Sequence, residues 1–204
     1  MLIVVGGHSR NIGKTSVAEG LIRALPEFQF AAIKITQYGH GVCSNHGRSC
    51  GCEGDADHPF TLSEEYEPST TDSGRFLGAG ARRSFWLRTR TGELSAAAGP
   101  LKRLLAQNEN VIAESNSLLE LAQPDLYLVT LDFACADFKD SSARFLERAD
   151  AFVVIDRDEW RSGVWDQRPC FRARPPKYVS AELVEFCRER RRQVIAEDPE
   201  KHPL

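Results

Sequence analysis

A short apolar run, a glycine-rich turn and a helical pattern follow one another at the start of the chain. The run Leu2–Val5 is fully apolar, as a strand buried on both faces of a sheet must be. After the turn, apolar residues recur at helical spacing at Val17, Leu21 and Ala24. A strand that leads through a tight turn into a covering helix is the repeating unit of parallel sheets. This beginning therefore predicts an α/β protein.

The rest of the chain continues this alternation of strands and helices. Because sequential parallel strands need crossover helices, the pattern predicts a three-layer, mainly parallel sheet with helices on both faces. We expect one domain over residues 1–204, since no linker divides the chain. The further strands are expected at Phe28–Ile35, Ser84–Arg90, Val111–Glu114, Leu126–Leu131, Ala151–Ile155 and about Cys170–Arg172, and further helices at Leu94–Leu105, interrupted at Gly99-Pro100, and at Ser180–Ile195.

Composition narrows the classes of partner. The 204 residues are 42% hydrophobic and 27% charged, which suits a single core of ordinary size. A net charge of −3 provides no general basic field for nucleic acid or an anionic membrane surface. The run Leu2–Val5 is too short for a signal peptide or a membrane span. We expect a cytoplasmic protein with a specific small ligand.

The turn after the first strand has the residues that a phosphate site needs. Gly6, Gly7 and Gly13 leave room for backbone N–H groups to converge on an anion. Lys14 adds a positive charge for the β- and γ-phosphates, and the hydroxyl of Thr15 or Ser16 can bind Mg²⁺. The turn therefore predicts a nucleotide site for ATP or GTP. Its expected members are Gly7, His8, Ser9, Arg10, Asn11, Ile12, Gly13, Lys14, Thr15 and Ser16.

Three charged residues are expected at the same edge of the sheet. Lys34 ends a predicted strand, where ligands of open α/β sheets bind, and would face the γ-phosphate or an anionic substrate. Glu114 ends another apolar strand, and Asp72 precedes a helix. Phosphate-bound Mg²⁺ is held by one or two carboxylates, so Asp72 and Glu114, with Thr15, are its expected ligands. Lys14, Thr15, Lys34 and Glu114 are the expected catalytic residues.

Residues 36–71 lack apolar periodicity and are expected to form an insertion rich in cysteine and histidine. Thiolate and imidazole are the ligands that Zn²⁺ prefers, and four of them could close a tetrahedral site. An iron–sulfur cluster, a redox pair or a polar loop with incidental thiols are the alternatives. The preferred ligands are Cys43, His46, Cys50 and Cys52, with His40 and His58 as substitutes.

Several segments resemble known families. The spacing of Gly7, five residues and then Gly13-Lys14-Thr15 resembles the dethiobiotin synthetase group of P-loop proteins. The segments AAIKITQYGHG from Ala31, DSGRFLGAGA from Asp72 and VIAESNS from Val111 resemble the molybdopterin-guanine dinucleotide biosynthesis B proteins. The resemblance implies a P-loop NTPase fold and a role in attaching a nucleotide to the molybdenum cofactor.

Three functions agree with these observations. The first is Mg²⁺-dependent binding and slow hydrolysis of ATP or GTP, with a molybdopterin-type or other small anionic substrate implied by the resemblance. The second is an ATP-dependent ligase or kinase similar to dethiobiotin synthetase. The third is a nucleotide-controlled module that carries metal in the insertion. A partner protein and a homodimer are also left open, since symmetric dimers are common among the proteins that the chain resembles.

Overall fold

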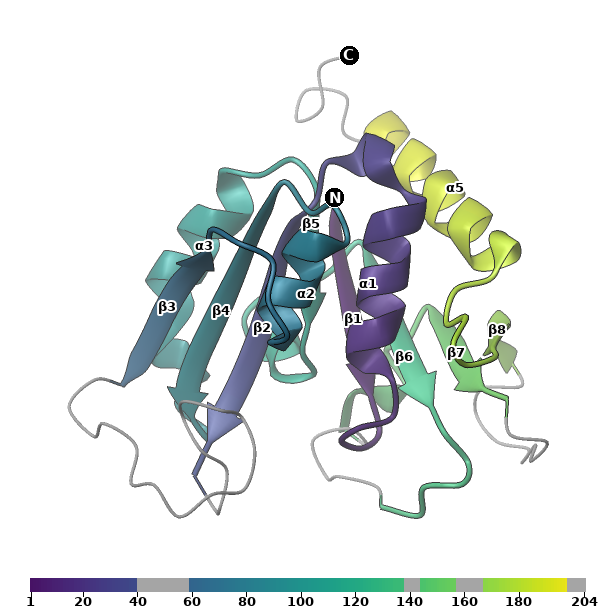
Figure 1. The fold of residues 1–204 in the computed structure, drawn as a ribbon, viewed down its shortest axis with the longest axis horizontal. Helices are drawn as coiled ribbons and strands as arrows, with labels where there is room; N and C mark the ends of the chain where they lie inside the picture. Colours follow the sequence, from purple (N-terminus) through teal and green to yellow (C-terminus); the bar gives the residue numbers. More distant parts are fainter. Residues whose placement is uncertain (40–58, 138–143, 157–166, 198–204) are drawn as a thin grey trace.

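The computed structural model describes residues 1–39, 59–137, 144–156 and 167–197. These residues contain one eight-stranded sheet (Figure 1). The strand order is β3-β4-β2-β5-β1-β6-β7-β8. All neighbouring pairs are parallel except β3 and β4, which are antiparallel. The expected mainly parallel α/β sheet is confirmed. The strands are β1 (Leu2–Gly7), β2 (Ala31–Tyr38), β3 (Phe60–Glu65), β4 (Arg83–Arg90), β5 (Val111–Glu114), β6 (Leu126–Leu131), β7 (Ala151–Ile155) and β8 (Cys170–Ala173).

Helices cover both faces of this sheet, as expected. The helices α1 (Lys14–Ala24), α2 (Asp72–Gly78) and α5 (Ala181–Glu197) contribute to an apolar cluster on one face. The helix α3 (Ala98–Ala106) and the 3₁₀ turns η2 (Leu94–Ala97) and η3 (Ser117–Glu120) contribute to a second cluster on the other face (Figure 1). Because β1, β5, β6 and β7 lie between these two layers, their side chains are almost entirely buried.

The structure corrects the predicted extent of the insertion. The second strand begins at Ala31 rather than Phe28, because Pro26–Phe28 forms the 3₁₀ turn η1, and it continues to Tyr38. The predicted loop also contains β3, an edge strand in which the apolar residues Phe60 and Leu62 alternate with Thr61 and Ser63. That alternation is the period of a half-buried strand. The expectation that residues 36–71 lack apolar periodicity was therefore wrong for Phe60–Glu65.

The interruption in the third helical segment lies earlier than predicted. The 3₁₀ turn η2 ends at Ala97, and Gly99-Pro100 lie in the first turn of α3. Proline is tolerated there because the first helical N–H groups have no partner within the helix. The strands at Val111–Glu114, Leu126–Leu131 and Ala151–Ile155 have the predicted bounds.

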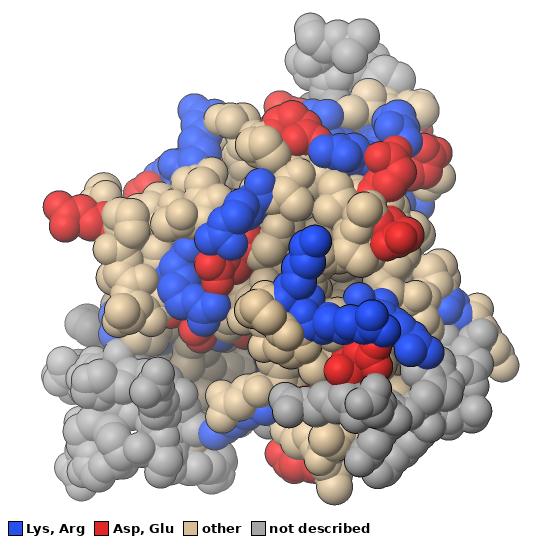
Figure 2. All heavy atoms as spheres, turned by 45° about the vertical axis from the view of Figure 1, so that its right-hand side comes forward, with Lys and Arg blue, Asp and Glu red and all other residues tan. Residues whose placement is uncertain are grey.

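Charges of both signs are mixed on the surface. In Figure 2, Lys and Arg side chains lie beside Asp and Glu side chains over the upper part of the face shown. On α5, for example, Arg188 pairs with Glu27, and Arg192 pairs with Glu185 and Glu189. Such exposed pairs contribute little to stability, because water screens their charges. Within the four described ranges, none of the helices is long and apolar enough to cross a membrane.

Candidate functional site

The turn between β1 and α1 lies near the middle of the sheet, at the carboxyl end of β1. The strand β1 pairs with β5 on one side and β6 on the other, and α1 begins at Lys14. Gly13 has a φ of +92°, in the left-handed region that favours glycine, and it has no side chain to cap the first-turn amides of α1. Uncapped N–H groups at a helix start attract anions. The turn therefore has the strand, the glycine and the helix start that the sequence predicts, and phosphate binding there stays a prediction.

The side chain of Lys14 folds back over this turn. Its Nζ donates a hydrogen bond to the carbonyl oxygen of Ser9. Its stem crosses Gly7 so closely that a Cβ on Gly7 would lie 2.9 Å from Lys14 Cδ. The ammonium group is therefore held against the loop backbone, on the residues where a polyphosphate is expected to bind.

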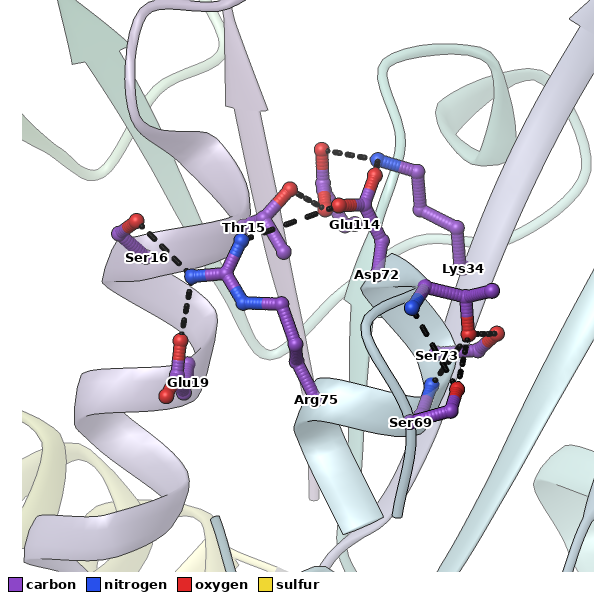
Figure 3. Close-up of polar contacts among 11 residues, drawn as sticks. Thr15, Ser16, Glu19, Lys34, Ser69, Asp72, Ser73, Arg75 and Glu114 are labelled. Atoms are coloured by element: carbon purple, nitrogen blue, oxygen red, sulfur yellow. Dashed lines mark hydrogen bonds and ion pairs between the residues drawn. The ribbon is translucent and has the colours of Figure 1, made fainter. Parts of the chain in front are cut away.

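Four side chains from four elements meet beside the turn (Figure 3). The Thr15 hydroxyl donates a hydrogen bond to Glu114 Oε2 at 2.7 Å, and Lys34 Nζ lies 2.6 Å from Glu114 Oε1. Asp72 Oδ2 is also 2.6 Å from Lys34 Nζ. Because β5 lies between β1 and β2, Glu114 is paired in register with both Val5 and Lys34. The structure brings the residues Thr15, Lys34, Asp72 and Glu114 into one network, which we call the carboxylate network.

Burial and charge determine the protonation of the carboxylate network. The side chain of Glu114 is 5% exposed and that of Lys34 16% exposed, whereas Asp72 is 41% exposed. Burial alone would lower the pKa of Lys34, but the charges of Glu114 and Asp72 outweigh it and raise that pKa. Burial would likewise raise the pKa of Asp72, but the charge of Lys34 lowers it. The lysine is therefore cationic and Asp72 anionic at neutral pH.

Arg75 links α2 to the first turns of α1. Its Nη2 lies 2.5 Å from Glu19 Oε2 and 3.3 Å from the hydroxyl of Ser16, and its Nη1 lies 3.9 Å from Asp72 Oδ1 (Figure 3). The guanidinium thus occupies the space between the two helices, with its charge already engaged. The Ser16 hydroxyl accepts this contact from Arg75.

The oxygen atoms of the carboxylate network are of the kind that Mg²⁺ binds. A hydroxyl and two carboxylate groups converge there, and Mg²⁺ bound to nucleotide phosphates needs only one or two carboxylates from the protein. Within the described part of the chain, no group of three or more His, Cys, Asp or Glu side chains could hold a metal by itself. The predicted zinc or iron–sulfur ligands Cys43, His46, Cys50 and Cys52 lie outside the described residues, as do His40 and His58.

Three residues that contact the turn were not predicted as part of the site. The Asn116 side chain accepts a hydrogen bond from Gly7 N and donates one to Gly7 O, both at 2.9 Å. Ser9 donates from its hydroxyl to Asp137 at 2.9 Å. Tyr178 packs so closely that a Cβ on Gly13 would lie 2.5 Å from its ring. Asn116 lies two residues after the end of β5, and this placement near the end of a strand is the one signal that could have identified it.

We expect the close packing of Gly6 to make Gly6→Ala destabilising. A Cβ there would lie 2.3 Å from Asn116 Oδ1 and 2.6 Å from the Tyr127 hydroxyl. Overpacking of this kind costs about 1–3 kcal/mol, which urea unfolding would measure. Gly99→Ala is the matched control, because its nearest atom, Arg103 Nη1, is 3.7 Å away and alanine favours the helix. Equal stability of the two variants would contradict this packing.

His8 predicts a pH dependence of stability. It is 1% exposed, and its Nε2 lies 3.3 Å from the carbonyl oxygen of Cys135. Burial lowers its pKa from the ordinary 6.5, so the unfolded chain takes up this proton first as the pH falls. The stability that neutral His8 contributes above pH 6.5 is then lost as the pH falls from 6.5 to the lower pKa of the folded protein. Urea unfolding from pH 7.5 to 5 should show a smaller loss for His8→Gln than for the wild type. If the free energy of unfolding depends on pH in the same way in both proteins, His8 does not contribute to the pH dependence.

Comparisons with known proteins add a distant structural similarity. No protein-family model and no curated protein matches the sequence. The apo form of LpxK from Aquifex aeolicus, solved in complex with ATP, aligns with 17% identity and a TM-score of 0.48. The alignment covers 84% of this chain and 53% of that one, so this chain spans about half the length of LpxK. A likeness this distant says nothing about the function of this chain. The α/β class is established by the sheet itself, whereas the resemblance to the two biosynthetic families stays a prediction.

Proposed function

We propose that this chain binds the triphosphate of ATP or GTP at the turn between β1 and α1 and hydrolyses it slowly with Mg²⁺. One observation carries the proposal. The hydroxyl of Thr15, the second residue of α1, is hydrogen-bonded to the buried Glu114, which Lys34 contacts on its other oxygen. A hydroxyl at a helix start, beside a carboxylate from a neighbouring strand, is the arrangement that nucleotide-bound Mg²⁺ requires.

Each residue has a defined task in this proposal. Uncapped amides at the start of α1 and the Lys14 ammonium hold the phosphates. Thr15, Glu114 and Asp72 would hold Mg²⁺, which neutralises charge on the β- and γ-phosphates when bound. Lys34 stabilises the negative charge that develops as water bonds to the γ-phosphorus and the bond to the bridging oxygen breaks. The products are a nucleoside diphosphate and inorganic phosphate.

Phosphate release tests this function. Purified protein incubated with ATP or GTP and Mg²⁺ should release inorganic phosphate slowly, and EDTA should reduce the release to background. Wild-type release that persists in EDTA, or nucleotide binding that Mg²⁺ does not change, would contradict the proposed role of the carboxylate network. A role in molybdenum cofactor nucleotide attachment would then be tested by adding a molybdopterin-type ligand.

Transfer of the phosphoryl group to an acceptor other than water is the second candidate. The sheet continues beyond Lys34 as a half-exposed polar face, including Thr36 and Trp86, on which a second substrate could lie. A kinase or a ligase similar to dethiobiotin synthetase would form the diphosphate only when its acceptor is added. Diphosphate formation that depends on an added small molecule would therefore favour this candidate over simple hydrolysis.

The metal-carrying function depends on Cys43, His46, Cys50 and Cys52, which lie outside the described residues. It remains a separate proposal with a separate test. Elemental analysis of protein purified without added metal should find stoichiometric zinc or iron. Metal-free protein with reduced cysteines would contradict it.

A further inference from the structure

We infer that Arg75 is a positioning residue, which holds Asp72 of α2 beside Thr15 and Glu114, where the proposed Mg²⁺ binds. This inference rests on the proposed function and deepens it, because it names a residue outside the carboxylate network on which the metal site depends. Arg75 acts through the position of the helix that carries Asp72, and not by contact with the metal.

Asp72 lies on a different element from the other two expected Mg²⁺ ligands. Thr15 is in α1, which follows β1, and Glu114 ends β5, which is paired with β1. Asp72 is the first residue of α2, a helix of only seven residues. A helix this short is marginal by itself and depends on contacts with its neighbours. The position of the Asp72 carboxylate is therefore set by the contacts that hold α2.

Hydrogen bonds from the sheet hold one side of α2. The Ser84 hydroxyl of β4 donates to the carbonyl oxygen of Ser73 at 2.7 Å, and the Ser73 hydroxyl donates to Glu65 of β3 at 2.5 Å. In the strand order, β2 and β5 separate these two strands from β1. Phe76 packs in the apolar cluster that α1 shares, but apolar burial is non-directional. These contacts fix α2 on the sheet without orienting its first turn towards Thr15.

Arg75 makes the directional contact between α2 and α1 (Figure 3). Asp72 and Arg75 are at positions i and i+3 of α2, so their side chains lie on one face of that helix. From this face the guanidinium reaches α1, where Nη2 contacts Glu19 Oε2 at 2.5 Å and Ser16 Oγ at 3.3 Å. Ser16 directly follows Thr15. One side chain therefore joins the helix of Asp72 to the turn of α1 that carries the Thr15 hydroxyl.

The sign of the effect on Mg²⁺ binding separates positioning from simple electrostatics. The guanidinium of Arg75 lies 3.9 Å from a carboxylate oxygen of Asp72. As a positive charge it repels a metal ion, so its removal alone would strengthen Mg²⁺ binding or leave it unchanged. As a positioning residue it keeps Asp72 in place, so its removal weakens Mg²⁺ binding. Loss of a residue that orients a metal ligand typically lowers metal affinity about 10–100-fold. We expect the lower end, because the contacts of Ser73 remain.

Nucleotide affinity with and without Mg²⁺ tests the inference. A non-hydrolysable ATP analogue is titrated by calorimetry in Mg²⁺ and in EDTA, and the ratio of the two affinities measures how far the metal supports binding. Arg75→Ala should lower this ratio about tenfold, with the affinity in EDTA unchanged. Arg75→Lys keeps the charge and should lower the ratio less. Arg23→Ala is the matched control and should behave as the wild type, because Arg23 also pairs with Glu19, at 2.9 Å, but from within α1.

Amide hydrogen exchange provides a readout that needs neither nucleotide nor Mg²⁺. If Arg75 holds α2, the amides of Asp72–Gly78 should exchange faster in Arg75→Ala than in Arg23→Ala, because α2 then opens more often. Equal exchange rates in the two variants would overturn the inference.

The outcomes separate this inference from the proposed function. A ratio that Arg75→Ala leaves unchanged or raises, or an equal loss of affinity in Mg²⁺ and in EDTA, would overturn the positioning role. If the wild type does not bind the analogue, the proposed function fails, and hydrogen exchange still tests whether Arg75 holds α2. If Arg75→Ala does not fold, Arg75→Gln removes the charge but keeps part of the side chain, and it is judged by the same ratio.

Discussion

Replacing Lys14 with alanine should lower the affinity for ATP or GTP about a hundredfold without unfolding the protein. The ammonium group lies over the turn, and its Nζ donates a hydrogen bond to the carbonyl oxygen of Ser9. Its loss therefore removes contacts to the phosphates while leaving the core intact. Charge-assisted hydrogen bonds contribute about 1.5–3 kcal/mol each, and about 2.7 kcal/mol corresponds to a hundredfold change.

Isothermal titration calorimetry with Mg²⁺ would measure this change. Lys102→Ala, which removes an exposed lysine from α3 on the opposite face of the sheet, is the matched control and should bind normally. Equal affinity of the Lys14→Ala variant and the wild type would show that the turn does not hold the phosphates.

Replacing Lys34 with methionine should lower the free energy of unfolding at pH 7 by about 3 kcal/mol. The variant leaves Glu114, 5% exposed, without the ammonium group of Lys34, and a broken buried ion pair costs about 3–5 kcal/mol. We expect the lower end of that range, because Asp72 is 41% exposed and water screens it. Chemical denaturation measures the loss.

The cost of Lys34→Met should depend on pH in a defined direction. The stabilisation from Lys34 is present below its ordinary pKa of 10.5 and is lost as the pH rises through the raised folded pKa. The stabilisation from Asp72 is present above its ordinary pKa of 3.8 and is lost as the pH falls through the lowered pKa of the folded protein. The difference between variant and wild type should therefore be largest between about pH 4 and 10.

A second substitution is the control for Lys34→Met. The double variant Lys34→Met/Glu114→Leu removes the buried acid together with its cation, and apolar replacements of a buried pair are often neutral. It should recover much of the lost stability. A double variant as unstable as the single one would show that the loss does not come from the unpaired carboxylate.

The local parts of the site could be predicted from the sequence, because neighbouring residues determine them. Strand, glycine turn and helix follow one another directly, so the geometry around Gly13 and the start of α1 agrees with the prediction. Period-2 alternation at Phe60–Glu65 also predicts a strand, and β3 was missed because the surrounding segment has no apolar pattern.

The assembly of the carboxylate network depends on strand order, which the sequence does not specify. Lys34 and Glu114 are adjacent because β5 lies between β1 and β2, a pairing between segments 80 residues apart. The sequence predicted Lys34 to face the γ-phosphate or an anionic substrate, and the structure adds two carboxylate partners that the sequence did not predict. The contacts of Asn116 with Gly7 and of Asp137 with Ser9 likewise depend on the neighbours of β1 in the sheet.

A calorimetric comparison of ATP, ADP and AMP, each with Mg²⁺, tests most directly whether the turn between β1 and α1 holds a triphosphate. If the amides of the turn and the Lys14 ammonium group bind the phosphates, the affinity should increase with each added phosphate, and GTP should bind as ATP does. Absence of binding, or AMP bound as tightly as ATP, would contradict the account.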